Sequence, residues 1–269
     1  MLANLNHTFI TLIPKVKKPE FVSEFQPISL CNVLYKFFSK VLANRLKKIL
    51  PNIITEYQSA FTKSRLISDN ILVAFESLHS MQRHTGKDDN MTIKLDMSKA
   101  YDRVEWVYLE AVMRKMGFAE RWVRLMMTCI TSVSYSILIN GEPKGMVVPT
   151  RGIRQGDPLS PFLFLLCTEG LNGLISQAAN RGNIKGFALC KNSPRLTHLL
   201  WINLVLLNYI LLFLETTRTV TRTSTIKHAL PTSKFHVQIQ FLKSNRSRNS
   251  NTSCYLNISS GSSDIYIVP

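Results

Sequence analysis

The sequence predicts an α+β fold, and three patterns carry this prediction. Apolar residues recur at helical spacing through residues 28–50, with basic residues at the positions between them. Residues 91–96 instead alternate between apolar and polar, as a half-buried strand does. Residues 134–148 contain a second alternating segment followed by Asn140 and Gly141, a favoured hairpin turn.

The first half of the chain is expected to contain an extended lead-in and two helices. Residues 7–27 form the lead-in, and Pro51 should end the basic amphipathic helix at 28–50, because proline removes a backbone donor. A loop then leads to a second helix that continues to Met81. Its candidate caps are Ser68, Asp69 and Asn70.

The middle of the chain predicts helices on both sides of the hairpin. Asp102 and Glu105 have the spacing of a capping box for a helix over residues 104–116, with Gly117 just past its end. A further helix is built on Trp122 to Ile130, and a long apolar helix covers about residues 159–178.

Asp96 is the first candidate functional residue, because it stands where the strand pattern ends. A carboxylate at a strand end needs a cation or a basic partner. From the spacing alone, a surface salt bridge and a metal site both remain open.

Residues 151–161 read R-G-I-R-Q-G-D-P-L-S-P and are the second candidate. Gly152 and Gly156 allow close backbone approach, Asp157 can cap a helix, and Pro158 suits a first helical turn. The segment is therefore compatible with an ordinary loop and helix start. It also suits phosphate or a nucleotide, because amide donors and the helix dipole would point the same way.

With both stretches in view, the sequence resembles the reverse transcriptase domain of plant LINE-type (non-LTR) retrotransposons. The resemblance covers residues 7 to about 200 and rests on six ordered blocks: H-T-F-I-T-L-I-P-K (7–15), F-Q-P-I-S-L-C-N-V-L-Y-K (25–36), K-V-L-A-N-R-L-K (40–47), Q-S-A-F-T-K-S-R-L-I-S-D-N-I (58–71), the Asp96 stretch, and R-Q-G-D-P-L-S-P (154–161). It implies the fingers and part of the palm of a right-hand polymerase, with the thumb absent. It also implies RNA-directed DNA polymerase activity on an RNA template, a DNA primer and deoxynucleoside triphosphates, with no stable protein partner.

The resemblance also assigns site residues. Tyr101 matches the aromatic residue that selects against ribose, with core packing as the alternative explanation of an aromatic there. Gln155 and Gly156 match residues that contact the incoming nucleotide, and Arg154 would add charge to that surface. Basic residues that hold the triphosphate are matched by Lys63 and Arg65, with solvated charge as the alternative. The family usually has glycine where Ser64 stands.

The chemistry of the family requires two Mg²⁺ ions about 4 Å apart, held by carboxylates from more than one strand. Asp96 and the carbonyl of Met97 match the first ligands. The rest should come from a hairpin about a hundred residues later, in a motif F-A-D-D. This sequence instead has Asn203 and Leu204 near that place, and its only acids after Glu169 are Glu215 and Asp264. We therefore expect a chain truncated before this motif, without its hairpin, and inactive in polymerisation.

Charge and cysteine content agree with an intracellular nucleic-acid enzyme. The formal net charge of +16 favours polyanions, although ribosomal and membrane-surface proteins share this property. Five cysteines without a C-x-x-C pair suggest reduced thiols, and the N-terminal residues lack the pattern of a secretory signal. The expected location is the nucleus or cytoplasm.

The predicted organisation is a fingers-like part at residues 1–87, a partial palm at 88–200, and an apolar run with a disordered basic tail at 201–269, attributed to a frameshift or splice error. Two alternatives remain. The chain could be a nucleic-acid-binding remnant without catalysis. Residues 196–214, which lack charge, could instead form a membrane anchor, although their polar residues make a membrane location unlikely.

Overall fold

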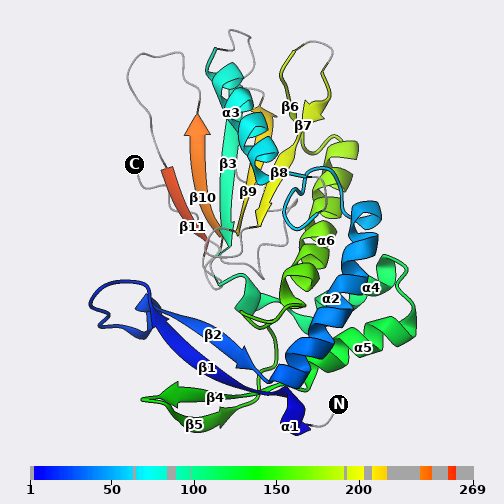
Figure 1. The fold of residues 1–269 in the computed structure, drawn as a ribbon. Helices are drawn as coiled ribbons and strands as arrows, with labels where there is room; N and C mark the ends of the chain where they lie inside the picture. Colours follow the sequence, from blue (N-terminus) through cyan, green and yellow to red (C-terminus); the bar gives the residue numbers. More distant parts are fainter. Residues whose placement is uncertain are drawn as a thin grey trace. The chain divides into compact units, whose positions relative to one another are not determined.

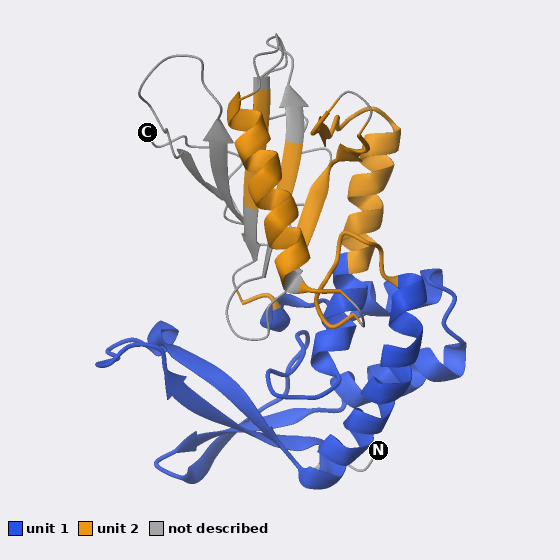
Figure 2. Cartoon of the chain, turned by 45° about the horizontal axis from the view of Figure 1, so that its top comes forward, with its two compact units in different colours: residues 1–53, 101–168 blue, residues 54–100, 169–269 orange. Residues whose placement is uncertain are grey.

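The computed structural model describes residues 3–62, 65–83, 89–97, 99–190, 193–202, 208–216, 237–243 and 254–258. Helices and strands are mixed along the chain, so the predicted α+β class is confirmed (Figure 1). The chain divides into two compact units, each made of two segments: residues 1–53 with 101–168, and residues 54–100 with 169–269 (Figure 2). The predicted domain boundaries after residues 87 and 200 stay predictions.

Unit 1 contains a four-stranded sheet in the order β2-β1-β4-β5, and a group of helices. Its elements are α1 (Ala3–Asn6), β1 (His7–Pro14), the 3-10 turn η1 (Val22–Glu24), β2 (Phe25–Cys31), α2 (Val33–Ile53), the 3-10 turn η2 (Tyr101–Arg103), α4 (Trp106–Lys115), α5 (Glu120–Thr131), β4 (Ser134–Ile139), β5 (Glu142–Val147) and the start of α6 (Ser160–Asn180). β1 pairs antiparallel with β2 and parallel with β4. Fully buried side chains of the helices form the core: Leu46, Leu50, Leu109, Met113, Met126 and Leu163.

Local signals explain much of unit 1. Asn140 and Gly141 have φ angles of 52° and 84°, so the predicted hairpin turn between β4 and β5 is confirmed. Gly117, with φ of 83°, follows the end of α4 as predicted. The predicted capping box is wrong, because Asp102 lies in η2, and α4 begins after Glu105 without a side-chain cap.

The first long helix begins later than the sequence pattern predicts. Residues 28–31 belong to β2, where Ile28 and Ser29 pair with residues of β1, and Asn32 then caps α2 by accepting a 2.9 Å hydrogen bond from the Leu34 N–H. Pro51 does not end this helix but lies in its last turn, and the helix continues to Ile53. Part of the predicted apolar face is also exposed, including Leu34 and Phe37.

Unit 2 contains a five-stranded antiparallel sheet in the order β11-β10-β3-β9-β8, a two-stranded sheet β6-β7, and a covering helix. Its elements are α3 (Ile67–Arg83), β3 (Asp89–Met97), the end of α6, β6 (Phe187–Ala188), β7 (Arg195–Leu196), β8 (His198–Ile202), β9 (Asn208–Thr216), β10 (Val237–Lys243) and β11 (Cys254–Ile258). α3 packs on the sheet through a buried cluster that includes Ala74, Met81, Leu199, Leu211 and Phe213.

Two expectations for the C-terminal part are corrected, and one alternative is contradicted. A hairpin of β8 and β9 lies beside β3, although we expected no hairpin there. The tail after residue 200 contributes β10 and β11 to the same sheet, so it is not disordered throughout. The described part of residues 196–214 forms strands rather than a membrane helix, and Leu199, Leu211 and Phe213 pack in the buried cluster with α3.

Among the described residues one helix, α6, is long and apolar enough to cross a membrane. The fold buries 61% of its apolar window, as expected for the core helix of a soluble protein. α6 therefore gives little support to a membrane location.

Candidate functional site

Two stretches that are distant in sequence meet in unit 1. The N–H of Gly152 donates to the carbonyl of Val104 at 2.8 Å, and the N–H of Ile153 donates to that of Tyr101 at 2.9 Å. Gly152 has φ of 90°, and a Cβ at this position would lie 3.0 Å from the carbonyl oxygen of Asp102. The prediction that this glycine permits close backbone approach is confirmed. The segment after β3 and the R-Q-G-D loop are therefore one structural feature.

The second half of the same loop rests on β2. The carbonyl of Gln155 accepts a 2.8 Å hydrogen bond from the Ser29 N–H, and the Gln155 side-chain Oε1 accepts one at 3.2 Å from Nε2 of Gln26. Gly156 has φ of 101°, and a Cβ there would lie 3.0 Å from the Ser29 carbonyl oxygen. Glycine is needed at this position for both reasons.

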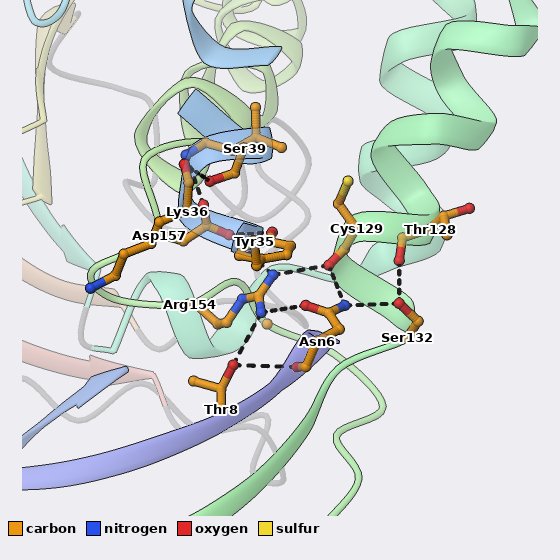
Figure 3. Close-up of polar contacts among 12 residues, drawn as sticks. Asn6, Thr8, Tyr35, Lys36, Ser39, Thr128, Cys129, Ser132, Arg154 and Asp157 are labelled. Carbon is orange, nitrogen blue, oxygen red and sulfur yellow. Dashed lines mark hydrogen bonds and ion pairs between the residues drawn. The ribbon is translucent and has the colours of Figure 1, made fainter. Parts of the chain in front are cut away.

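Arg154 points into the interior of unit 1 (Figure 3). Its side chain is 2% exposed, forms a 3.2 Å ion pair with Asp157, and lies with its guanidinium carbon 3.9 Å from the ring centre of Tyr35. The Tyr35 hydroxyl donates to the same Asp157 carboxylate at 2.6 Å. Burial, and then the nearby Asp157 charge, raise the pKa of Tyr35 well above its usual range. The remaining guanidinium bonds go to Asn6 Oδ1 at 2.6 Å, Thr8 Oγ1 at 3.2 Å and the Cys129 carbonyl at 3.0 Å.

This network corrects one expectation and confirms another. Arg154 does not add charge to a nucleotide-facing surface, because its side chain is buried and paired with Asp157. The Asp157 carboxylate also accepts a 2.9 Å hydrogen bond from the Leu159 N–H just before α6, so the prediction that it acts as a cap is confirmed. Arg154 and Asp157 thus hold the loop in shape, and Gln155 and Gly156 lie between them.

Tyr101 lies at the start of η2 and is half-buried. Its ring centre is 5.1 Å from that of Phe164 in α6, in a tilted contact. Burial raises the pKa of Tyr101 to about 12, so its hydroxyl is neutral at physiological pH. The packing contact is present, and the assignment of Tyr101 to sugar selection stays a prediction.

Arg65 also has a structural role that the sequence did not indicate. Its guanidinium donates to three backbone carbonyls of the preceding loop: Thr55 at 2.5 Å, Gln58 at 2.8 Å and Ile54 at 3.3 Å. These bonds give Arg65 a role in holding the loop, and its assignment to the triphosphate stays a prediction. Lys63 and Ser64 lie outside the described residues.

β3 carries Asp96 and Met97 at its last two positions. The residues paired with Asp96 on the two neighbouring strands are Tyr209 and Gln238, and neither is a carboxylate. Glu215 pairs with Asn90, six residues from Asp96, which corresponds to about 20 Å at roughly 3.3 Å per residue.

The residues present therefore do not fit a site for two Mg²⁺ ions. Asn203, Leu204 and Asp264 lie outside the described residues, and the first two are not carboxylates in any case. Within the described residues no three His, Cys, Asp or Glu side chains are grouped so as to hold a metal. In the part of the chain that the structure describes, Asp96 and the Met97 carbonyl are the remaining candidate ligands.

A buried polar network in unit 2 was missed by the sequence reasoning. His198 is fully buried, with Nε2 bonded to Oδ1 of Asn172 and Nδ1 lying 2.8 Å from the hydroxyl of Thr197. Asn172 in turn donates to the hydroxyl of Thr55 at 2.6 Å and to the carboxylate of Glu169 at 2.7 Å. Burial lowers the pKa of His198 to about 4, so it is neutral at physiological pH. The bonds from Asn172 to His198 and to Thr55 join residues 26 and 117 positions apart, so no local spacing could reveal the network.

Comparison with protein families gives a match over most of the chain. The model described as "Reverse transcriptase (RNA-dependent DNA polymerase)" matches residues 13–202. This range includes every residue singled out above in the loop, η2 and the end of β3.

Three curated relatives cover parts of the same region. An uncharacterised mitochondrial protein of Arabidopsis thaliana is 56% identical over 64 residues, which are 24% of this chain and 52% of that protein. An uncharacterised 149 kDa protein of transposon TX1 from Xenopus laevis is 32% identical over 160 residues, covering 60% of this chain and 12% of that protein. The Pol polyprotein of type-1 retrotransposable element R2 from Popillia japonica is 28% identical over 178 residues, covering 62% of this chain and 24% of that protein. The chain thus spans about half or less of each relative.

Solved structures with a similar fold are telomerases. The apo telomerase of Candida tropicalis, truncated from its C-terminal domain, aligns with a TM-score of 0.58 and 13% identity, covering 98% of this chain and 55% of that chain. The telomerase of Candida albicans in complex with a fragment of telomeric RNA aligns with a TM-score of 0.53 and 13% identity, covering 95% and 44%. At this identity the likeness establishes the fold alone, and it agrees with the expected polymerase fingers and palm.

Proposed function

Because the chain belongs to the reverse transcriptase (RNA-dependent DNA polymerase) family, we propose that it is the fingers and partial palm of a non-LTR retrotransposon polymerase. In this proposal it binds an RNA template, a DNA primer and a deoxynucleoside triphosphate, in the nucleus or cytoplasm. The observation that carries the proposal is the joined loop and η2 segment, which brings Tyr101, Gln155 and Gly156 into one unit.

The proposed roles are those that the resemblance to the family implies, except where the hydrogen bonds of a residue indicate an indirect role. Gln155 and Gly156 contact the incoming nucleotide, Tyr101 limits space at the sugar, and Lys63 pairs with phosphate. Arg154 and Arg65 act indirectly by fixing the backbone of the two loops that carry these residues. Asp96, with the Met97 carbonyl, offers one Mg²⁺ ligand set.

We further propose that this chain does not polymerise DNA by itself. In-line phosphoryl transfer with two Mg²⁺ ions needs carboxylates from more than one strand, and the residues beside Asp96 are Tyr209 and Gln238. Losing these carboxylates removes several kcal/mol of transition-state stabilisation. Binding of nucleic acid does not depend on them.

A second candidate function, binding of nucleic acid without catalysis, is favoured by the charge distribution. The net charge is +16, and five exposed basic side chains lie on α2: Lys36, Lys40, Arg45, Lys47 and Lys48. Contacts to phosphate from such residues are independent of sequence and weaken steeply with salt.

One experiment tests both candidates. The chain is mixed with a poly(rA) template and a labelled oligo(dT) primer, and binding and extension with dTTP and Mg²⁺ are measured at several salt concentrations. We expect salt-sensitive binding, unchanged in Asp96→Ala, and no extension. Extension that is abolished by Asp96→Ala would show that the metal site is sufficient and overturn the proposal of inactivity. Absence of binding at low salt would argue against both functions.

A further inference from the structure

Gln155 is fixed by its surroundings before any ligand binds. Its carbonyl is bonded to the Ser29 N–H at 2.8 Å, the preceding Arg154 is buried, and the following Gly156 lies against the backbone of Ser29. The backbone at this position therefore has little freedom. The remaining variable is the direction of the Gln155 carboxamide.

Gln26 restricts that direction. Its Nε2 donates to Oε1 of Gln155 at 3.2 Å, and both side chains are half-buried. Gln26 is itself held in β2, where it pairs with Ile13 of β1. The contact joins residues 129 positions apart, so it follows only from the fold.

A carboxamide whose oxygen is already bonded presents its NH₂ group to a ligand. In this orientation Gln155 is a donor, and the matching ligand group is an acceptor oxygen or ring nitrogen. A deoxynucleoside triphosphate offers such acceptors on its phosphates, sugar and base. The donor direction would be lost if the carboxamide turned over by 180°.

We propose that Gln26 is a positioning residue that directs the Gln155 NH₂ group toward the incoming deoxynucleoside triphosphate, an inference that rests on the proposed nucleotide-binding function. Gln26 acts through Gln155. Its effect is therefore on nucleotide affinity rather than on the binding of primer and template.

The test variants at position 26 differ in whether the side chain donates or accepts hydrogen bonds. Arginine carries donors only, so Gln26→Arg keeps the Gln155 oxygen occupied and its NH₂ group outward. Glutamate at neutral pH is acceptor-only, so Gln26→Glu attracts the NH₂ group and turns the Gln155 oxygen toward the ligand. Gln82→Glu, at an exposed position of α3, introduces the same charge elsewhere and is the matched control.

The first measurement is equilibrium binding of labelled dTTP to the chain loaded with poly(rA) and oligo(dT) in Mg²⁺. We expect Gln26→Glu to raise Kd by about tenfold, the effect of one lost hydrogen bond, and Gln26→Arg to change it by about twofold at most. Because direct charge effects are screened by salt, the difference should persist at high salt. Equal affinity of Gln26→Glu and the unmodified chain would overturn the inference.

A second measurement separates this inference from the function on which it rests. In a double-mutant cycle without nucleotide, Gln26→Leu and Gln155→Leu are made singly and together, and unfolding by urea is followed. We expect coupling of about fivefold in the unfolding equilibrium constant. Coupling without any dTTP binding by the unmodified chain would contradict the proposed function, and the role of Gln26 toward nucleotide with it. Absence of coupling would refute the Gln26–Gln155 contact itself.

Discussion

Replacing His198 by glutamine should remove the contribution of His198 to the pH dependence of stability between about pH 6.5 and pH 4. Asn172 uses its NH₂ group for Thr55 and Glu169, so its oxygen faces His198 and the Nε2 of the imidazole carries the proton. The neutral ring is therefore the form that the network accepts. Glutamine can offer a comparable donor without titrating.

The magnitude follows from the pKa of His198, which burial lowers from 6.5 to about 4. A shift of roughly 2.5 units corresponds to about 3 kcal/mol. The sign follows from proton binding: below pH 6.5 the unfolded chain takes up a proton that the folded chain does not. The contribution of neutral His198 to the free energy of unfolding is therefore complete above pH 6.5 and is lost as the pH falls to about 4.

The assay is urea unfolding of the unmodified chain, His198→Gln and His79→Gln, at about pH 7 and about pH 4.5. His79 is a partly exposed histidine of the same unit, so its variant serves as the control. Contributions of the other ionisable groups are shared by all three proteins and cancel in the comparison. If the unmodified chain and His198→Gln lose equal stability on acidification, the assignment of a buried neutral His198 is refuted.

Two further substitutions test the loop that carries Gln155. Arg154→Met should cost about 3–5 kcal/mol of unfolding free energy, because it leaves Asp157 buried without its cation, whereas Arg151→Met at the exposed pair with Glu105 should cost less than about 1 kcal/mol. Both costs are measured by urea unfolding. Adding Asp157→Asn to Arg154→Met should restore part of the lost stability. If Arg154→Met costs less than Arg151→Met, the buried ion pair is contradicted. Gly156→Ala should cost about 1–3 kcal/mol, because φ is 101° and the added Cβ meets the Ser29 carbonyl, whereas Gly173→Ala in α6 meets no atom within 4 Å and should be neutral or stabilising. Equal melting temperatures of the two alanine variants would count against the described path of the loop.

The sequence predicted those elements whose signals are local. The hairpin at Asn140 and Gly141, the end of α4 at Gly117, and the strand leading to Asp96 depend on a few adjacent residues. α3 was also predicted as a helix, but its buried face was not, because Ile71, Leu72 and Phe75 are exposed. The meeting of the two motif stretches was not predicted from spacing, but the need for glycine at Gly152 and Gly156 was.

The errors concern features that depend on contacts seen only in the folded chain. Residues 28–31 have helical apolar spacing, but they form part of the strand β2 because they pair with β1. Arg154 and Arg65 looked like surface charges, and their partners are known only from the fold: Asn6 is 148 residues from Arg154, and Arg65 turns back to three carbonyls of its own loop. The strands after residue 200 have weak local patterns and are ordered by pairing with β3.

The two-segment construction of unit 1 also determines when it can fold during synthesis. β1 pairs with β4, and Asn6 bonds to Cys129 and Arg154, so the first segment lacks these partners until residue 154 has been made. From residue 53 onward that is about a hundred residues, or about 5–20 s of translation at roughly 5–20 residues per second. During this interval the residues of α2 that the folded unit buries, Leu42, Leu46 and Leu50, lack their native neighbours. A nascent chain of this design should depend on ribosome-associated chaperones more than one whose first domain is continuous in sequence.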